Sequence, residues 1–163
     1  NYAATPGAGN SGVQIANAAT ASVWAYNNTT AATHIIFANA NGNVGTIQTS
    51  GSSTSYNTSS DYRLKENIAP VTDGITRLQQ LKPSRFNFIA DPDTTLDGFL
   101  AHEVQTIVPE AITGEKDAVD DEGNPKYQGI DQSKLVPLLT AALQEAIAKI
   151  ETLEQRLADA GIA

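Results

Sequence analysis

Charge is distributed along this chain in a way that divides it into two regions. The sequence has 163 residues, with ten Lys or Arg and eighteen Asp or Glu, and all of them lie between Asp61 and Ala163. At this composition a charge-free stretch of 60 residues does not arise by chance. The two regions therefore meet different physical demands, and we predict two domains, over residues 1–59 and 60–163.

The uncharged region is predicted to be rich in β-structure. Short runs of β-branched and aromatic residues interrupt a background of Asn, Thr, Ser, Ala and Gly. Residues 49–59 indicate an extended linker or an irregular strand. A disordered linker throughout is the alternative, although the aromatic and aliphatic side chains argue against it. Because so few large apolar groups make a thin core, we expect a sheet assembled between identical chains, at the end of an oligomeric shaft. The predicted strands cover residues 13–15, 22–26, 34–37 and 44–47, with a turn at Asn41-Gly42-Asn43.

The charged region is predicted to be a compact α+β domain. Apolar spacing favours a helix over residues 71–81 and a second, shorter helix over residues 99–108. Between them, alternation of apolar and polar residues over 85–89 predicts a strand. The segment 120–125 combines Asp, Gly, Asn and Pro and predicts a turn.

The C-terminal segment 132–161 carries the pattern of a coiled-coil helix. Its apolar residues step alternately by three and four through about four heptads, as the a and d positions of a coiled coil do. Ala142 at g and Ile147 at e widen the apolar stripe, which favours three strands or packing on the domain body. A helix that packs only within its own chain is the alternative. The a and d residues, called the seam below, are Val136, Leu139, Leu143, Ala146, Ile150, Leu153, Leu157 and Ala160.

Composition excludes several classes of function. The absence of cysteine excludes disulfide scaffolds, thiolate zinc sites and cysteine nucleophiles. A net charge of −8 repels phosphate backbones, so we expect no nucleic-acid partner. We also expect no membrane span, no signal peptide and no cofactor. We expect no metal site either, because the acidic residues at 117–122 lack the spacing of a calcium-binding loop. Since the chain does not begin with Met, we expect a C-terminal fragment of a longer protein.

A serine and a lysine stand five residues apart where the two regions meet. Ser60 and Lys65 suggest a dyad, because a serine hydroxyl needs a base and a lysine amine can replace histidine when desolvation favours its neutral form. This spacing separates the side chains on a helix or a strand, so they can meet only across a turn or between chains. By itself the pair is weak evidence, since a serine before a charged first turn is commonly a helix cap.

The sequence around this pair resembles a known family. Ser60-Asp61-Tyr62-Arg63-Leu64-Lys65 is similar to the signature of the self-cleaving intramolecular chaperone domains at the C-termini of phage tail spikes and fibres, such as endosialidases. The resemblance continues, in order, to the end of the chain. Its further motifs are Gly98-Phe99-Leu100-Ala101-His102-Glu103-Val104-Gln105 with Pro109-Glu110, and Ile130-Asp131-Gln132-Ser133-Lys134-Leu135-Val136-Pro137-Leu138-Leu139.

The resemblance implies a function as well as a fold. It implies an α+β domain, ending in the coiled-coil helix, that forms a homotrimer, templates the upstream phage fibre shaft and then cuts itself off. Carried over by position, Ser60 is the nucleophile and Lys65 the base, and the scissile bond is Ser59–Ser60. Such a serine autopeptidase turns over once. We interpret His102 and Glu103 as auxiliary residues near the dyad, or else as an ordinary polar pair on a short helix.

Three functions from different classes remain open at this point. The first is the self-processing chaperone, folding in the host bacterial cytoplasm, with the mature fibre part in the virion tail and the chaperone part released or retained after cleavage. The second is a non-cleaving structural trimerisation cap of the fibre tip. The third is a peptidase that acts on other chains, which ranks last because Ser60 lies on the linker itself.

Overall fold

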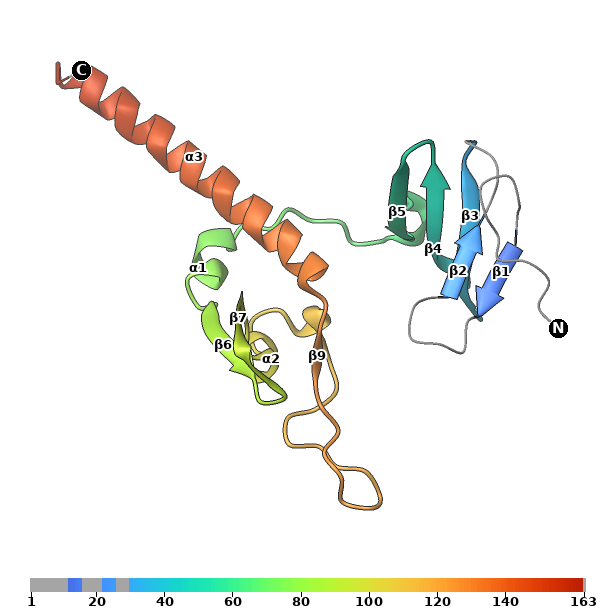
Figure 1. Ribbon diagram of the computed structural model, residues 1–163. Coiled ribbons are helices and arrows are strands. Elements are labelled where there is room, and N and C mark those ends of the chain that lie inside the picture. The colour runs from blue at the N-terminus through green and yellow to red at the C-terminus, as the bar shows by residue number, and fades with distance from the viewer. Residues whose placement is uncertain (1–11, 16–21, 26–29, 163) are drawn as a thin grey trace. The chain divides into compact units, whose positions relative to one another are not determined.

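The computed structural model describes residues 12–15, 22–25 and 30–162 (Figure 1). By their contacts the residues form two compact units, 1–68 and 69–163, which are treated separately below. Residues 60–68 thus contact the first unit, although the charge step precedes them. Within the described residues, no helix is long and apolar enough to cross a membrane.

The first unit contains two antiparallel sheets. In the larger sheet, β4 lies between β3 and β5 in a simple meander. The tract predicted as linker or irregular strand is a strand for most of its length, since β5 pairs along β4. Tyr26, at the end of one predicted run, lies outside the described residues. The strands are β1 (Gly12–Ile15), β2 (Ser22–Ala25), β3 (Ala32–Asn39), β4 (Gly42–Ser50) and β5 (Ser53–Thr58).

Two tight turns set the register of this meander. Gly42 and Gly51 both have positive φ, +94° and +56°, a backbone conformation that glycine adopts without steric cost. At the first turn the Asn39 side chain also accepts a hydrogen bond from the Asn41 amide at 2.8 Å. The turn predicted at Asn41-Gly42-Asn43 is therefore confirmed, and it forces β3 and β4 into a hairpin.

The meander has no buried side chain among residues 30–68. Ile36 and Phe37 are each more than half exposed, and Tyr56 is 77% exposed. A sheet normally gains its stability by covering one apolar face. As a single chain, this unit leaves that face open.

The second unit is an α+β domain. A short helix, a β-hairpin and a second short helix precede a small two-stranded sheet, and a long helix follows. The elements are α1 (Gly74–Leu78), β6 (Ser84–Phe88), β7 (Asp91–Gly98), α2 (Ala101–Val104), η2 (Pro109–Ala111), β8 (Ile112–Thr113), β9 (Gly129–Ile130), η3 (Gln132–Leu135) and α3 (Val136–Asp159). Strand pairs are β6 with β7 and β8 with β9, both antiparallel.

Both short helices are shorter than the apolar spacing predicts. The segment 71–81 is α-helical only over α1, because the Glu145 carboxylate accepts hydrogen bonds from the Gly74 and Ile75 amides, at 2.6 and 3.1 Å, and so fixes where α1 begins. The segment 99–108 is α-helical only over α2, although hydrogen-bonded turns continue to Val108. The predicted strand and turn are confirmed, except that Ile89 is the exposed tip of the hairpin.

An aliphatic core holds the second unit together. It forms where α2, η2 and the start of α3 meet. A close crossing of α1 and α3 adds to it, since a Cβ at Gly74 would lie only 2.5 Å from the Ala142 amide nitrogen. The buried members of the core cluster are Leu81, Val104, Val108, Ala111, Leu135 and Leu138, and α3 also buries Ala141 and Ala142.

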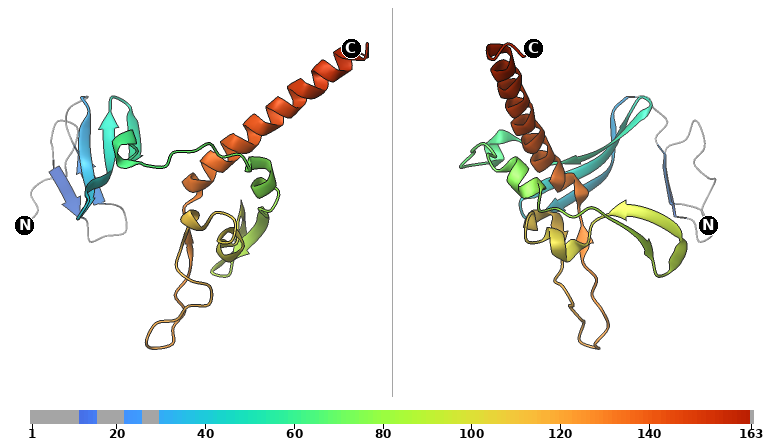
Figure 2. Two further views of the ribbon diagram at one scale, coloured as in Figure 1. Left: turned by 180° about the vertical axis from the view of Figure 1, so that it is seen from behind. Right: turned by 90° about the vertical axis from the view of Figure 1, so that its left-hand side faces the viewer.

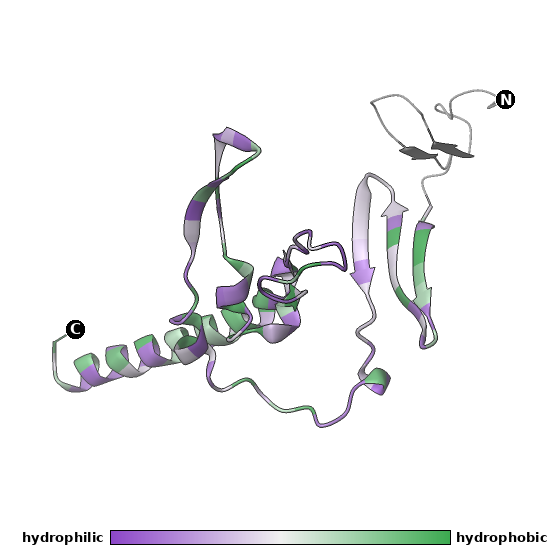
Figure 3. Cartoon of the chain, turned by 90° about the horizontal axis from the view of Figure 1, so that it is seen from below, coloured by the Kyte–Doolittle hydropathy of each residue, from purple (hydrophilic) through white to green (hydrophobic). Residues whose placement is uncertain are grey.

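The long helix presents two different faces. The predicted segment 132–161 is η3 followed by the 24-residue α3, which projects from the rest of its unit (Figures 1 and 2). Leu138 and Ala142 pack on the body, which for Ala142 is one of the two outcomes that the wider apolar stripe favours. The seam residues Leu143, Ile150, Leu153 and Leu157 are instead 47–62% exposed. Apolar and polar residues alternate along this helix (Figure 3). These four seam residues therefore leave about half of their surface uncovered by their own chain.

Candidate functional site

The structure brings Ser60 and Lys65 together. The Lys65 Nζ donates a hydrogen bond to the Ser60 Oγ at 2.8 Å. A 3₁₀ turn, η1 (Tyr62–Leu64), lies between them and reverses the chain. Of the two routes that the spacing allows, a turn or a contact between chains, the single chain uses the turn. The catalytic roles of both residues stay predictions.

One carboxylate caps this turn. Asp61 is the N-cap of η1, and its Oδ1 accepts a hydrogen bond from the Arg63 amide at 2.9 Å. The Arg63 guanidinium donates to the same carboxylate through Nε and Nη2, at 2.9 and 2.8 Å. These hydrogen bonds from Arg63 hold the pKa of Asp61 below its ordinary value, the side-chain bonds more than the backbone one. Arg63 thus pairs with Asp61, two residues before it in the sequence.

The residue before Ser60 is fixed to the sheet of the first unit. The Ser59 amide donates to the Val44 carbonyl at 3.1 Å, which extends the pairing of β4 and β5 by one residue. Its hydroxyl donates to the Asn43 carbonyl at 3.0 Å. The Ser59–Ser60 peptide bond therefore lies between two anchors, the sheet on one side and the capped turn on the other.

Solvent surrounds this arrangement in the single chain. Every residue from 51 to 68 is exposed, including three large apolar side chains. Tyr62, Leu64 and Ile68 are 71–76% exposed. A lysine acts as a base only after it loses its proton, and desolvation is the usual means of favouring the neutral amine. Ser60 and Lys65 are thus at hydrogen-bonding distance, as a dyad requires. Residues 51–68 do not, however, supply the apolar surroundings that would desolvate the Lys65 amine.

The two predicted auxiliary residues belong to the second unit. Both lie on α2, where Glu103 forms an ion pair with Lys82 at 3.1 Å and His102 is exposed. That pair accounts for Glu103 structurally. A role of either residue near the dyad stays a prediction.

The acidic loop of the second unit is closed by its own backbone. The Asp120 carboxylate accepts hydrogen bonds from the amides of Glu122 and Asn124, at 2.9 and 2.8 Å, and from the Asn124 side chain. These bonds hold the pKa of Asp120 below its ordinary value, chiefly through Asn124. Among the described residues, no group of three His, Cys, Asp or Glu side chains is arranged to hold a metal ion.

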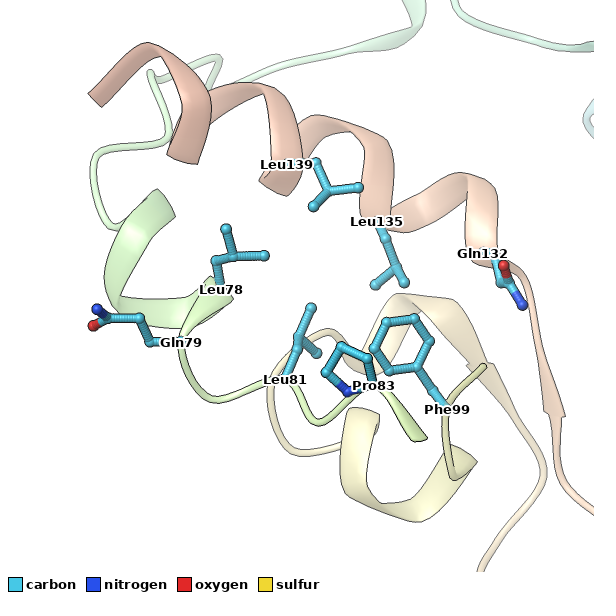
Figure 4. Close-up of a pocket in the computed structure, with 8 residues that line it drawn as sticks. All are labelled: Leu78, Gln79, Leu81, Pro83, Phe99, Gln132, Leu135 and Leu139. Carbon is cyan, nitrogen blue, oxygen red and sulfur yellow. The ribbon is translucent and has the colours of Figure 1, made fainter. Parts of the chain in front are cut away.

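An apolar pocket that the sequence does not predict lies between α1 and the start of α3. Its volume is about 370 Å³. Leu78, Leu135 and Leu139 point into it, and Gln79 points away (Figure 4). Its lining offers no pair of groups for acid–base chemistry, but Leu139 also belongs to the seam. The lining residues are Leu78, Gln79, Leu81, Pro83, Phe99, Gln132, Leu135 and Leu139.

Comparison with known proteins finds a match for the segment that contains Ser60 and Lys65. Residues 60–113 match the peptidase S74 family model, described as chaperone of endosialidase. This confirms the resemblance over the first two motifs, and the match begins at the serine of the candidate dyad. The third motif, over residues 130–139, lies beyond the matched segment and stays a prediction. No curated protein matches the chain.

Proposed function

With residues 60–113 matching the chaperone-of-endosialidase family, we propose that the chain is an intramolecular chaperone that cuts itself off between Ser59 and Ser60. It forms a homotrimer, templates the folding of a phage fibre or spike, and then separates from it by autoproteolysis. The observation that carries this proposal is the 2.8 Å contact of Lys65 Nζ with Ser60 Oγ, one residue from the Ser59 carbonyl.

The chemistry uses the chain's own groups. Neutral Lys65 takes the hydroxyl proton of Ser60, and Oγ attacks the carbonyl carbon of Ser59 to form a C–O bond. The C–N bond then breaks as Lys65 returns the proton to the Ser60 nitrogen, which leaves an ester between Ser59 and the Ser60 side chain. Water hydrolyses this ester, giving a Ser59 carboxylate and a Ser60 residue with a free amine and a free hydroxyl. The bond is cut once per chain.

Intramolecular attack makes a weak nucleophile sufficient. Ser60 is covalently next to the bond it attacks, and well-aligned intramolecular reactions lower a barrier by up to about 7–11 kcal/mol. Ser59 is held by two hydrogen bonds to β4, so the carbonyl side is restrained as well. Alignment of the reacting groups is thus a property of the local fold.

Assembly supplies what the single chain lacks. Residues 30–68 bury no side chain, and the seam residues Leu143, Ile150, Leu153 and Leu157 are 47–62% exposed. Both surfaces are covered together if three chains align in parallel, with α3 as a coiled coil. Such packing also covers Tyr62, Leu64 and Ile68 beside Lys65, which desolvates its amine. Cleavage then reports that assembly is complete.

The mass of the purified chain under denaturing conditions tests this function. Wild type should give fragments corresponding to residues 1–59 and 60–163. Ser60→Ala and Lys65→Ala should each give the intact chain, still trimeric by sedimentation. Ser59→Ala is the matched control, because it removes the neighbouring hydroxyl but keeps the dyad and the bond of the residue 59 amide to Val44, so it should still be cut. A new N-terminus at residue 60 in Ser60→Ala or Lys65→Ala would refute the assignment.

A non-cleaving trimerisation cap is the second candidate, and the exposure of the dyad favours it. If the assembled wild-type chain stays intact on prolonged incubation, the cap is the correct function. Mixing intact Ser60→Ala chains with wild type tests a peptidase that acts on other chains. Cutting of the Ser60→Ala chain in the mixture would support that third function.

A further inference from the structure

The turn that joins Ser60 to Lys65 depends on one side-chain pair. The Asp61 carboxylate receives three hydrogen bonds, all from Arg63: one from its amide and two from its guanidinium. Two backbone bonds complete the turn, from the Leu64 amide to the Asp61 carbonyl and from the Lys65 amide to the Tyr62 carbonyl, each at 3.1 Å. We call this carboxylate–guanidinium pair the clamp.

Within the single chain, core packing does not hold this turn in place. None of the residues of η1 is buried, and Tyr62 and Leu64 are each more than 70% exposed. A three-residue 3₁₀ turn is a short and weakly hydrogen-bonded element. Its population therefore depends on its cap, and a bidentate guanidinium–carboxylate pair is the strongest side-chain contact that it has.

We propose that Asp61 and Arg63 are positioning residues, which act through Lys65 by keeping the turn closed and the amine at the Ser60 hydroxyl. The proposal rests on the autoproteolysis proposed above. Neither residue takes part in proton transfer. Asp61 matters more, because its carboxylate both caps the turn and receives the guanidinium, whereas Arg63 supplies its amide in any variant.

The effect on cleavage should exceed the effect on stability. An exposed ion pair contributes little to global stability, and Arg63 and Asp61 have side chains 74% and 41% exposed. The cleavage rate instead scales with the fraction of chains whose turn is closed. Loss of a capping side chain lowers that fraction by about fivefold, judging by the usual cost of removing a helix cap.

Single-turnover cleavage rates of the full chain test the clamp. Asp61→Ala should slow cleavage by about fivefold or more, whereas Asp61→Asn, which still caps, should slow it by only about twofold. Asp97→Ala is the matched control, because Arg85 forms the same two-pronged pair with Asp97, at 2.7 and 3.0 Å, on the β6–β7 hairpin. It should leave the rate unchanged. An Asp61→Ala chain cut as fast as wild type overturns the proposal.

Rescue of Lys65→Ala with an added amine tests whether Asp61 acts only by positioning Lys65. If a small primary amine such as ethylamine restores cleavage to Lys65→Ala, adding Asp61→Ala should not slow the rescued reaction, because no tethered lysine is left to position. A further slowing would overturn the proposal, since Asp61 would then act on Ser60 or on the fold.

A measurement without cleavage completes the test. In Ser60→Ala chains, hydrogen exchange at the Leu64 and Lys65 amides should be faster with Asp61→Ala and nearly unchanged with Asp61→Asn. Unchanged exchange with Asp61→Ala overturns the clamp even if the variant cuts slowly. Failure of wild type to cut at all would refute the proposed function, whereas faster exchange with Asp61→Ala would still support the clamp.

Discussion

Residues 69–162 bury eight hydrophobic side chains, whereas none of residues 30–68 is buried. The difference does not come from secondary structure, since β3, β4 and β5 form a regular sheet with well-defined turns. It comes from what each sheet or helix has to pack against. The second unit closes its core within one chain, and the first needs apolar surface from elsewhere. Perturbing each unit should therefore have different consequences.

The largest effect is expected from charges in the seam. Leu143→Asp together with Ile150→Asp buries carboxylates in the proposed coil, at a cost of several kcal/mol each. Trimers should disappear in sedimentation, and amides of residues 30–58 should then exchange rapidly while those around Val108 stay protected. Gln144→Asp with Ala148→Asp places the same charges outside the seam and should leave the trimer intact. A monomeric wild-type chain would refute the assembly.

A smaller effect should distinguish the two faces of α3. Leu138→Ala removes a side chain only 3% exposed and should destabilise the second unit by about 2–5 kcal/mol in urea unfolding. Leu143→Ala changes the same residue type where it is 62% exposed, and should cost less than about 1 kcal/mol in a dissociated chain. In assembled chains the Leu143→Ala cost should rise. If Leu143→Ala lowers the free energy of unfolding equally at low protein concentration, where chains dissociate, and at high concentration, where they assemble, the seam has no partner.

The close crossing of α1 and α3 predicts a further loss. In Gly74→Ala the new methyl would overlap the backbone at Ala141 and Ala142, so the helices must separate, at about 1–3 kcal/mol. Gly129→Ala is the control, because a Cβ there meets no atom within 4 Å. Thermal unfolding of the two variants should differ clearly. Equal melting temperatures would contradict the observed packing.

The smallest effect concerns pH. Hydrogen bonds from the Ile75 and Gly74 amides hold the pKa of Glu145 below its usual 4.5. The carboxylate thus contributes stability that is fully present above that value and is lost as the pH falls through the lower folded-state pKa. Glu145→Gln should be less stable than wild type at pH 7, with the difference shrinking on acidification. An unchanging difference between pH 7 and pH 3 would show that the charge contributes nothing.

Local sequence signals predict some features better than others. The charge step, the Asn41-Gly42-Asn43 turn and the strand over β6 are visible in neighbouring residues. The start of α1 is not, because it depends on Glu145, far along the chain. Heptad spacing predicts the seam, but it leaves open whether Ala142 meets a further strand or the domain body.

For the site, the serine–lysine spacing restricts the contact to a turn or a partner chain, without choosing between them. The turn forms because Asp61 caps it by accepting a hydrogen bond from the Arg63 amide. An aspartate that can accept from the backbone amide two residues later is a capping signal that could have been used. The hydrogen bonds of Ser59 to Asn43 and Val44 could not have been predicted, because they depend on the register of the sheet.

The two hydrogen bonds that tie Ser59 to the end of β4 determine what a cut would leave behind. The region up to Ser59 has no charged side chain. Hydrolysis would place a carboxylate at the end of that neutral sheet, held there by the strand pairing. In the trimer proposed above, three such carboxylates would be added to a region that carried no charged side chain. Residues 60–163 carry all the charged side chains, with a net charge of −8, and would gain one ammonium at Ser60. The new carboxylate would thus attract that ammonium locally but repel the rest of the domain, a charge effect that the uncut neutral sheet does not have.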